Sequence, residues 1–557
     1  MIIVAFTYCK RLINDYQLGI FFFKSSNDRK CRLPLRKKII KNRREKLKPI
    51  KECGIYYMSG KNGSGDLFST KLGLILSVLG IAVGTGNIWR FPRIAAQNGG
   101  QEGAGAFLIA WITCLFLFSI PLIIAEYGIG RHGRKGVVGS FINLVGKKYA
   151  WMGSFIGFVA TAIMFYYSVV AGWCLYYLAE SIFSSLPASM GQAETIWYGF
   201  QGSIWPSVFH AVMIGLGGLI VFKGISSIER INKVLIPSLL LVVVISLIRA
   251  VTLPGSFQGI EYLFTPDWAT LAQPSLWLEA LTQNAWDTGA AWGLILTYGA
   301  YMRSKDDITI SAFQTGIGNN IVSLLAAMTI FATVFGTLGS SMSNGEILNI
   351  MKTSGPASTG LTFMWMPQLF NEMAGGKLFA ILFFLGLTFA AFSSLISMIE
   401  LASRVFVDMG FPRKNATIAI CITGFLLGMP SAISTDILAN QDFVWAVGLM
   451  VSGAFMSFAI IKFDPDKFRS TIVNTGSQRF DLGKWWTVII KYVVPVEVIS
   501  LLIWWIYLSI TSYAPDSWYN PLSAFSVATI AVQWGIAMGL FYFYNDKIAD
   551  KSIRKTE

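Results

Sequence analysis

The stretch that decides the fold is KLGLILSVLGIAVGTGNIWRFPRIAAQNGG, residues 71–100. Residues 72–83 carry no charge and are mostly apolar, as in a membrane helix. The sequence Gly84-Thr85-Gly86-Asn87 then interrupts this pattern, and each glycine weakens a helix by about 1 kcal/mol relative to alanine. In lipid, backbone released from a helix is tolerated only where protein, water or a ligand satisfies its polar groups. The interruption therefore predicts a cavity at membrane depth with a binding site in it.

The composition is that of a polytopic membrane protein. The 557 residues are 54% hydrophobic and 13% charged, with a mean hydropathy of +0.56, whereas soluble proteins contain about 25% charged residues. The net charge of +15 is concentrated in residues 1–58, which hold 15 lysines and arginines against four acids. We interpret this basic segment as a solvated cytoplasmic tail and expect no nucleic-acid partner. Met58 is an alternative translation start.

The chain offers little material for catalysis. Its six cysteines form no CxxC pair and it has two histidines, so neither a zinc site nor a disulfide framework is predicted. A nucleophile elbow and a phosphate-binding loop are also absent from the sequence. We expect a protein that is not an enzyme.

Apolar runs long enough to span about 30 Å of hydrocarbon occur twelve times, near residues 72–92, 104–128, 151–182, 206–222, 231–252, 276–302, 309–341, 377–409, 415–430, 440–461, 486–511 and 523–545. The loops between them alternate between sets rich in lysine and arginine and sets with none, such as 183–205 and 512–522. The positive-inside rule then places both termini in the cytoplasm of a plasma (inner) membrane protein. The long outer loop 342–376 is either a vestibule lid or a surface connector.

A second interrupted helix, QNAWDTGAAWG at residues 283–293, lies five spans after the first. Because five is odd, a repeat of five helices must be inverted across the membrane, and paired broken helices mark a transport site near its midplane. We predict an all-α polytopic fold of twelve transmembrane helices. It comprises a tail (1–66), a first repeat (67–252), an inverted second repeat (276–461), two additional helices (486–545) and a second cytoplasmic tail (546–557).

Several motifs are more specific than this pattern: residues 72–92 as quoted above, IPLIIAEYGIGR (120–131), FYYSVVAGW (165–173), KGISSIERINKVLIP (223–237) and AAFSSLISMIE (390–400). Over residues 67–545 the chain resembles the neurotransmitter:sodium symporters, in particular members similar to the bacterial leucine transporter. The resemblance implies sodium-coupled import of an amino acid by alternating access, in a monomer or homodimer surrounded by membrane lipids. A non-transporting sodium-dependent amino-acid sensor and a channel-like leak remain alternatives.

The resemblance also implies two sodium sites. Site one comprises Ala82, Asn87, Asp287 and Asn319; site two comprises the carbonyls of Gly80, Val83 and Ala390 with the hydroxyls of Ser393 and Ser394. Carbonyl, amide and hydroxyl oxygens are the ligands that a hard cation prefers. Asn87 could equally cap a helix, and membrane serines often hydrogen-bond back to their own helix.

Asp287 departs from the family pattern, which usually has serine or threonine there. Ser323 stands where the bacterial leucine transporter has a glutamate, and Trp111 replaces a tyrosine that often contacts chloride. An ionisable group inside the membrane is a functional-site hypothesis by default. We expect Asp287 to balance the sodium charge, so that no chloride is required. A protonated Asp287 that donates a hydrogen bond, and a proton-coupled transporter, are the alternatives.

The substrate pocket follows from the same resemblance. Amine-transporting members carry an aspartate where this chain has Gly84, so the substrate is expected to bring its own carboxylate, as an amino acid does. Tyr167 either donates to that carboxylate or only packs. The pocket residues are Ile81, Ala82, Thr85, Gly86, Ile163, Tyr167, Trp286, Asp287, Gly289, Trp292, Ser394 and Met398. Their apolar and aromatic character favours a hydrophobic or aromatic substrate side chain.

Two gates are implied as well. Arg90 and Asp442 match the family's outer ion pair, and an intramembrane arginine needs such a partner. Tyr301 and Asp408 match the inner gate, but the arginine that usually pairs with the aspartate is replaced near Gly65. Lys61 or Lys71 are the candidate substitutes. Three further embedded acids are read as structural or hydration groups: Glu126, Glu400 and Glu497.

Overall fold

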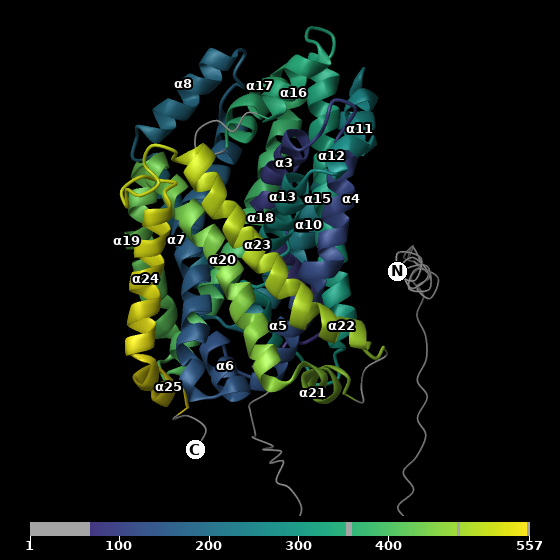
Figure 1. The fold of residues 1–557 in the computed structure, drawn as a ribbon. Coiled ribbons are helices and arrows are strands. Elements are labelled where there is room, and N and C mark those ends of the chain that lie inside the picture. Colours follow the sequence, from purple (N-terminus) through teal and green to yellow (C-terminus); the bar gives the residue numbers. More distant parts are fainter. Residues whose placement is uncertain (1–66, 353–358, 476–479, 554–557) are drawn as a thin grey trace, which may run out of the picture. The chain divides into compact units, whose positions relative to one another are not determined.

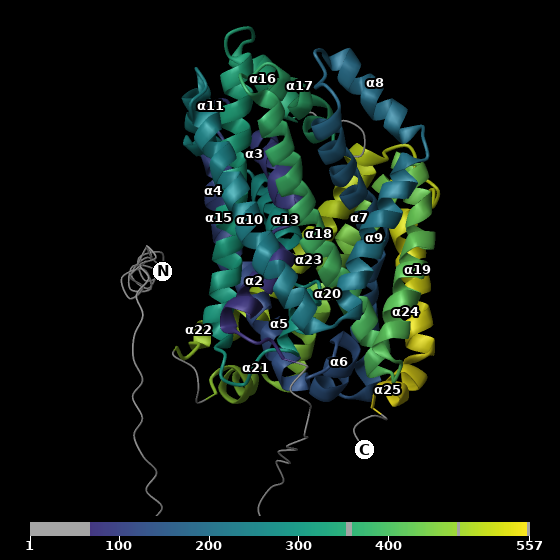
Figure 2. The same ribbon diagram turned by 180° about the vertical axis from the view of Figure 1, so that it is seen from behind.

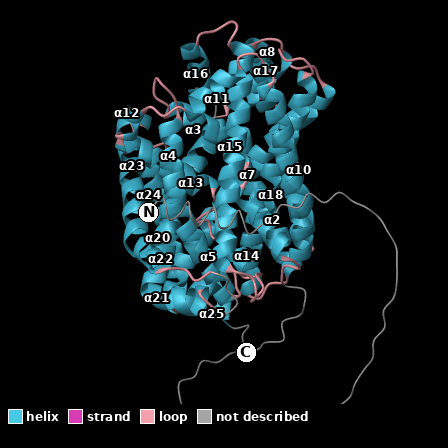
Figure 3. Ribbon diagram, turned by 90° about the vertical axis from the view of Figure 1, so that its right-hand side faces the viewer, coloured by secondary structure: helices cyan, strands magenta, loops and turns pink. Residues whose placement is uncertain are grey.

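The structure, a computed structural model, describes residues 67–352, 359–475 and 480–553. These residues form helices and loops without a β-strand, apart from an isolated bridge between Ala104 and Pro266 (Figure 3). The prediction of an all-α fold is confirmed. The tail, residues 1–66, with Met58, Lys61 and Gly65, lies outside the described part of the chain.

Nine helices of the described residues are long and apolar enough to cross a membrane. They are α4–α5 (Gly105–Gly133, including the π-helical turn η2), η3–α7 (Lys147–Phe183), α9 (Trp205–Phe222), α10 (Ile225–Val251), α15 (Ile308–Leu338), α18 (Gly376–Asp408), α19 (Arg413–Ile433), α20 (Thr435–Phe463) and α22–α23 with η7 and η8 (Lys484–Tyr513). Two bent pairs bring the number to as many as eleven: α2 (Lys71–Ala82) with η1–α3 (Gly86–Gln97), and α24 (Val527–Phe543) with α25 (Asn545–Ile553). The one predicted span not counted in this way is the sixth, residues 276–302, which corresponds to α13 (Pro274–Asp287) and α14 (Leu294–Gly299), separated by a break. The count of twelve and the inverted repeat stay predictions.

The first predicted break is present in the structure. Helix α2 begins after Thr70, whose Oγ1 accepts a hydrogen bond from Gly73 N at 2.9 Å. It ends at Ala82, and the chain resumes as the π-helical turn η1 (Gly86–Arg90), at an angle of 54° to α2. Helix α3 (Phe91–Gln97) continues it, with Pro92 in its first turn, where no N–H is needed.

The second predicted break separates α13 from α14. Three residues there have left-handed backbone angles: Gly289 (φ 69°), Ala291 (φ 70°) and Gly293 (φ 77°). Glycine adopts this conformation freely, but alanine does so rarely because its β-carbon approaches the backbone. The break therefore needs support from neighbouring residues at Ala291.

The interior is built around the long helices α7 and α18, whose middle turns are almost entirely buried. Helices α2 and α10 pack beside α18, as Figure 2 shows. Outer helices such as α19, α23 and α24 expose large apolar side chains along their length, among them Leu426, Ile503 and Leu540. A bilayer accounts for these exposed apolar faces.

The loop 342–376 folds into α16 (Asn344–Lys352), a π-helical turn η5 (Leu361–Trp365) and α17 (Met366–Asn371). Together with α8 (Met190–Gln201) these elements lie at one end of the molecule (Figure 1). Phe363 stacks on Trp197 of α8, with ring centroids 5.7 Å apart, and meets the edge of Trp89 in η1 at 5.9 Å. The loop thus contacts the outer half of the first broken helix.

Short helices complete the structure. They are α6 (Val137–Val145), α11 (Ser256–Phe264), α12 (Trp268–Leu271) and α21 (Pro465–Phe468). Helix α25 contains the described part of the predicted C-terminal tail, and Lys135 and Lys147 hold it through Ser552 O and the Asp550 carboxylate. We call the end that holds α6, α21 and α25 the α6 end; the charge pattern predicts it to be cytoplasmic.

Candidate functional site

The two breaks face a shared cavity. Of the residues predicted for the substrate pocket, Ile163 is fully buried in α7 and does not line this cavity. The others all line it, together with Gly84 and Asn87: Ile81, Ala82, Thr85, Gly86, Tyr167, Trp286, Asp287, Gly289, Trp292, Ser394 and Met398. Residues from α2, η1, α7, α13 and α18 thus meet at one place.

Gly84 lines the cavity between Tyr167 and Ser394. A β-carbon at this position would stand 3.1 Å from Tyr167 Oη and 3.2 Å from Ser394 Oγ, which is closer than ordinary van der Waals contact. The absence of a side chain lets Tyr167 reach the break, where its hydroxyl accepts a hydrogen bond from Thr85 N at 3.3 Å. Gly84 therefore keeps both a charge and a side chain out of the pocket.

Part of the cavity wall is aromatic. The rings of Trp286 and Trp292 meet edge to face, with centroids 5.5 Å apart, and Trp292 Nε1 donates to Ala285 O at 3.3 Å. The guanidinium of Arg90 lies 5.1 Å from the centroid of the Trp286 ring. Cation–π contact of this kind stabilises an arginine that burial would otherwise disfavour.

The residues predicted for sodium site one converge. Asn87 Oδ1 accepts from Gly84 N at 2.8 Å, so its Nδ2 points the other way and donates to Asn319 Oδ1 at 2.8 Å. This Asn319 Oδ1 also lies 3.1 Å from the carbonyl oxygens of Ala82 and Asp287. Asn87 thus caps the break, which was the alternative interpretation of this residue. It also orients Asn319.

The orientation of the Asn319 amide decides what this cluster binds. Turning the amide around would direct its Nδ2 at both carbonyls but would also set it against Asn87 Nδ2, another donor. Because the Gly84 N–H fixes Asn87, Asn319 must present its oxygen. Three oxygens then face one another with no proton between them, the arrangement that a hard cation bridges.

The carboxylate of Asp287 lies beside this cluster, and the residue is 3% exposed. Its Oδ2 accepts from Gln283 Nε2 at 3.4 Å and from Ser323 Oγ at 3.3 Å. Ser323 Oγ also accepts from Asn87 Nδ2 at 2.7 Å and so connects the carboxylate to site one. The other carboxylate oxygen, Asp287 Oδ1, is buried and has no hydrogen-bond partner among the described residues. An acceptor left open beside three further oxygens favours a nearby cation.

The residues predicted for site two lie where α2 meets α18. Ser394 Oγ donates to Gly80 O and to Ile81 O, both at 3.2 Å, and so bridges the two helices. Ser393 Oγ instead donates to Ala390 O of its own helix at 3.0 Å, which is the ordinary behaviour of a membrane serine. The β-carbon of Ser393 nevertheless packs directly on Gly80.

The predicted outer gate is not closed by a direct ion pair in this conformation. Asp442 Oδ1 accepts from Tyr166 Oη at 3.1 Å, while Arg90 lies over Trp286. Arg90 and Arg93 are both within electrostatic range of Asp442. Sequence reasoning missed Tyr166, although it directly precedes Tyr167 in the quoted motif.

The inner gate differs from the expected arrangement. The cation on Asp408 is Arg404, one turn earlier in α18, with Nε 2.9 Å from Oδ1; it is not Lys71. Arg404 also donates to Tyr301 Oη at 3.0 Å and to Arg134 O at 3.1 Å, and Asp408 Oδ2 accepts from Gly136 N. An arginine and an aspartate four residues apart on a helix are neighbours, which is the signal that sequence reasoning overlooked.

A second ion pair supports the same gate. The guanidinium of Arg413 binds the Glu400 carboxylate through two contacts, at 2.6 and 2.9 Å, and donates to Tyr301 Oη at 3.1 Å. Tyr301 in turn donates to Glu400 Oε1. Glu400 is thus bound by Arg413 and Tyr301 and does not line the cavity.

Replacing Arg404 with glutamine is expected to lower the free energy of unfolding by ~3–5 kcal/mol, because breaking a buried ion pair leaves Asp408 without its cation. The matched control is Lys71→Gln, which should lower it by less than ~1 kcal/mol since Lys71 does not contact Asp408. The measurement is thermal unfolding of the purified protein. Equal losses in both variants would return Lys71 to the gate.

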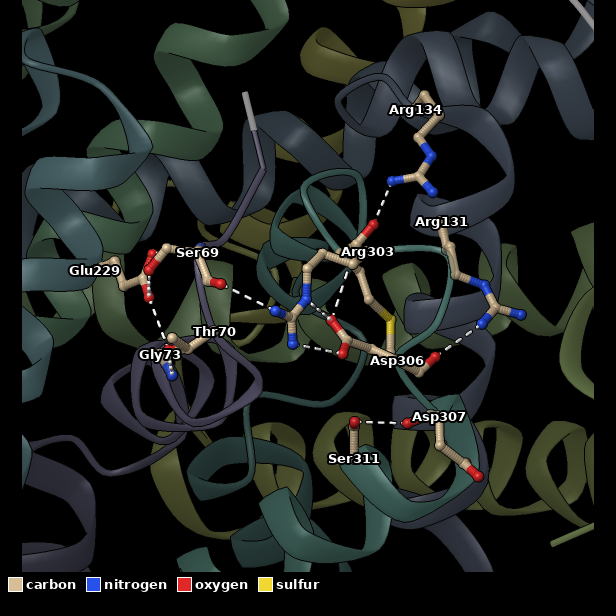
Figure 4. Close-up of polar contacts among 11 residues, drawn as sticks. Ser69, Thr70, Gly73, Arg131, Arg134, Glu229, Arg303, Asp306, Asp307 and Ser311 are labelled. Carbon is tan, nitrogen blue, oxygen red and sulfur yellow. Dashed lines mark hydrogen bonds and ion pairs between the residues drawn. The ribbon is translucent and has the colours of Figure 1, made fainter. Parts of the chain in front are cut away.

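The α6 end also secures the start of α2 (Figure 4). Glu229 of α10 accepts hydrogen bonds from Ser69 N at 2.8 Å and from Thr70 Oγ1 at 3.1 Å. Arg303 donates to Ser69 O at 2.9 Å and pairs with Asp306 at 2.8 Å. An acid at a helix N-terminus interacts favourably with the exposed N–H groups and the helix dipole.

Glu126 supports the break between α13 and α14. This fully buried acid of α5 accepts hydrogen bonds from Ala291 N at 2.6 Å and from Leu296 N at 3.0 Å. The structural role expected for Glu126 is thus visible as two contacts to the strained backbone. Glu497, by contrast, has an Oε2 without a hydrogen-bond partner in the described part of the chain.

The comparisons with known proteins agree with this arrangement. The sequence matches the Sodium:neurotransmitter symporter family over residues 65–198 and 202–545. An uncharacterized sodium-dependent transporter of Methanocaldococcus jannaschii is 32% identical over 463 residues, which are 78% of this chain and 89% of that protein. The sodium-dependent serotonin transporter of Drosophila melanogaster is 25% identical over 497 residues, covering 79% and 76%. The crystal structure of MhsT in complex with L-phenylalanine gives a TM-score of 0.67 at 27% identity, covering 79% and 99%.

Two broken helices that face one cavity are typical of a secondary transporter. The chain belongs to the sodium:neurotransmitter symporter family, and it is a sodium-dependent symporter in the membrane. The family assignment made from the motifs is confirmed, as is the expectation that the protein is not an enzyme.

Proposed function

We propose that the protein imports a hydrophobic or aromatic amino acid together with sodium, without a requirement for chloride. The observation that carries this proposal is the juxtaposition of three facing oxygens, those of Asn319, Ala82 and Asp287, with the Asp287 carboxylate beside the cavity. This group supplies both ligands and negative charge for a sodium ion. A protein that carries its own counter-charge needs no anion from solution.

The substrate class follows from the distribution of charge in the cavity. Asp287 is the one acid among the lining residues, and its Oδ2 is turned toward Gln283 and Ser323. A substrate amine would therefore meet carbonyl oxygens at the breaks, while a substrate carboxylate would complete the sodium shell and meet Tyr167. The tryptophan wall suits an apolar side chain. MhsT, a structural relative, binds L-phenylalanine.

Site two, between α2 and α18, would hold a second sodium ion through Gly80, Val83, Ala390, Ser393 and Ser394. Each sodium ion that enters the cell moves one charge down the membrane potential, worth about 2.3 kcal/mol per 100 mV. Sodium that completes its shell only with substrate present couples the two binding events reciprocally. The protein would lie in the plasma (inner) membrane with the α6 end and both termini on the cytoplasmic side. In this orientation the energy drives import, by a monomer or a homodimer.

Purified protein in proteoliposomes tests the proposal. We expect an inward sodium gradient to concentrate a labelled hydrophobic or aromatic amino acid, equally well in chloride and in gluconate. Sodium-dependent binding without concentrative uptake would favour the sensor, and downhill flux without concentration would favour the leak. Uptake driven by a pH gradient in sodium-free buffer would instead establish proton coupling through Asp287. Uptake that requires chloride would contradict the proposed role of Asp287.

A further inference from the structure

Helices α2 and α10 meet along a narrow seam. Gly73, Ser77 and Gly80 are spaced by four and three residues and so lie on one face of α2. A β-carbon at Gly73 would stand 1.9 Å from Glu229 Oε1, and one at Gly80 would stand 3.5 Å from Asn232 Cγ. The glycines therefore allow two polar side chains of α10 to lie directly on α2.

Asn232 is the unusual member of this seam. It is fully buried, and neither its Oδ1 nor its Nδ2 has a hydrogen-bond partner among the described residues. The same holds for Ser77 Oγ, on the facing side of α2. Leaving a buried polar group unsatisfied costs about 1–3 kcal/mol. Unpaired groups on both sides of one seam point to a polar ligand that they share.

Gly80 connects Asn232 to sodium site two. The position of its β-carbon borders the Asn232 amide on one side and Ser393 Cβ, 3.2 Å away, on the other. Its carbonyl accepts the hydrogen bond from Ser394. The unpaired amide thus lies next to the residues proposed to bind the second sodium ion.

We propose that Asn232 and Ser77 form an outer part of site two, where they bind water in the hydration shell of the sodium ion on the side that faces α10. This inference rests on the proposed position of site two. Amide and hydroxyl groups suit this role because each can bind a water oxygen or hydrogen. The seam ends at Glu229, whose carboxylate pairs with Lys233 Nζ at 2.7 Å and binds the start of α2 (Figure 4).

Two substitutions at Asn232 give opposite expectations. Asn232→Leu fills the same space without polar atoms, so we expect higher stability in sodium-free buffer and a half-saturating sodium concentration raised about tenfold. Asn232→Asp introduces a carboxylate and is expected to lower that concentration about threefold. The readout is the melting temperature of the purified protein over a sodium titration, with substrate affinity measured separately at saturating sodium. Substrate affinity should stay within about twofold of the parent.

Ser246→Ala is the matched control for Ser77→Ala. Ser246 also has an unpaired hydroxyl, but it lies 14 residues beyond Asn232 in α10, about 21 Å along the helix. We expect Ser77→Ala to raise the half-saturating sodium concentration and Ser246→Ala to leave it unchanged. Equal sodium titrations for the parent and both Asn232 variants would overturn the inference. A parent protein that sodium does not stabilise would instead overturn the proposed function.

Discussion

Uptake by an Asp287→Asn variant is expected to fall at least about 100-fold, equivalent to ~2.7 kcal/mol. Asparagine keeps the size of the side chain and an oxygen for Gln283 and Ser323, so the fold around α13 should persist. What it removes is the negative charge beside the oxygens of Asn319 and Ala82. Without that charge, sodium enters a low-dielectric site uncompensated, where electrostatic energies are several times larger than in water.

Asp287→Ser separates charge from side-chain geometry. A serine leaves space for an anion and offers a hydroxyl donor, so chloride is expected to restore part of the sodium-driven uptake in this variant, whereas gluconate should not. The measurement is initial uptake in both anions at a fixed sodium gradient. A matched control is Glu497→Gln, which neutralises another embedded acid away from the cavity and should change uptake less than about twofold. Sodium-driven uptake that survives in Asp287→Asn would rule out the internal counter-charge.

The sequence predicts the two helix breaks well because their cause is local. Glycine pairs weaken a helix wherever they occur. A polar interruption in an apolar run indicates backbone that lines a cavity or is buried in protein, because lipid cannot satisfy its polar groups. Of the residues predicted for the substrate pocket from that logic and the motif resemblance, all except Ile163 line the cavity. The side on which a buried residue of α7 points depends on packing against several helices, which spacing alone does not determine.

The parts that could not be predicted are tertiary contacts between side chains and distant backbone. Lys61 and Lys71 were the candidate partners of Asp408; Lys61 lies outside the described residues, and the partner that the structure shows is Arg404 of the same helix. Asn232 gave no signal, because a single asparagine among Glu229, Arg230 and Lys233 does not show which helix it faces. Local pattern specifies where a helix breaks; it does not specify what holds the broken ends.

Glu126 is the clearest support for such a broken end, and its removal is expected to have the second large effect. Glu126→Ala leaves Ala291 N and Leu296 N buried without their acceptors. Hydrogen bonds to charged groups contribute about 1.5–3 kcal/mol each, so the two bonds predict a loss of ~3–6 kcal/mol of stability. We expect little folded protein and uptake near background, measured by fluorescence-detected size-exclusion chromatography, thermal melting and proteoliposome uptake.

A substitution at the strained residue Ala291 distinguishes the loss of these hydrogen bonds in Glu126→Ala from a general loss of packing. Ala291 has a φ of 70°, a conformation that costs a residue other than glycine of the order of 1–3 kcal/mol. Glycine at this position relieves that strain, so Ala291→Gly should recover about 1 kcal/mol of the stability lost in Glu126→Ala. Glu497→Ala, which truncates an embedded acid that holds no strained backbone, should gain nothing from Ala291→Gly beyond its effect in the parent. If Ala291→Gly stabilises both acid variants equally, Glu126 only fills space; a larger gain in Glu126→Ala shows that its carboxylate holds the break in its left-handed conformation.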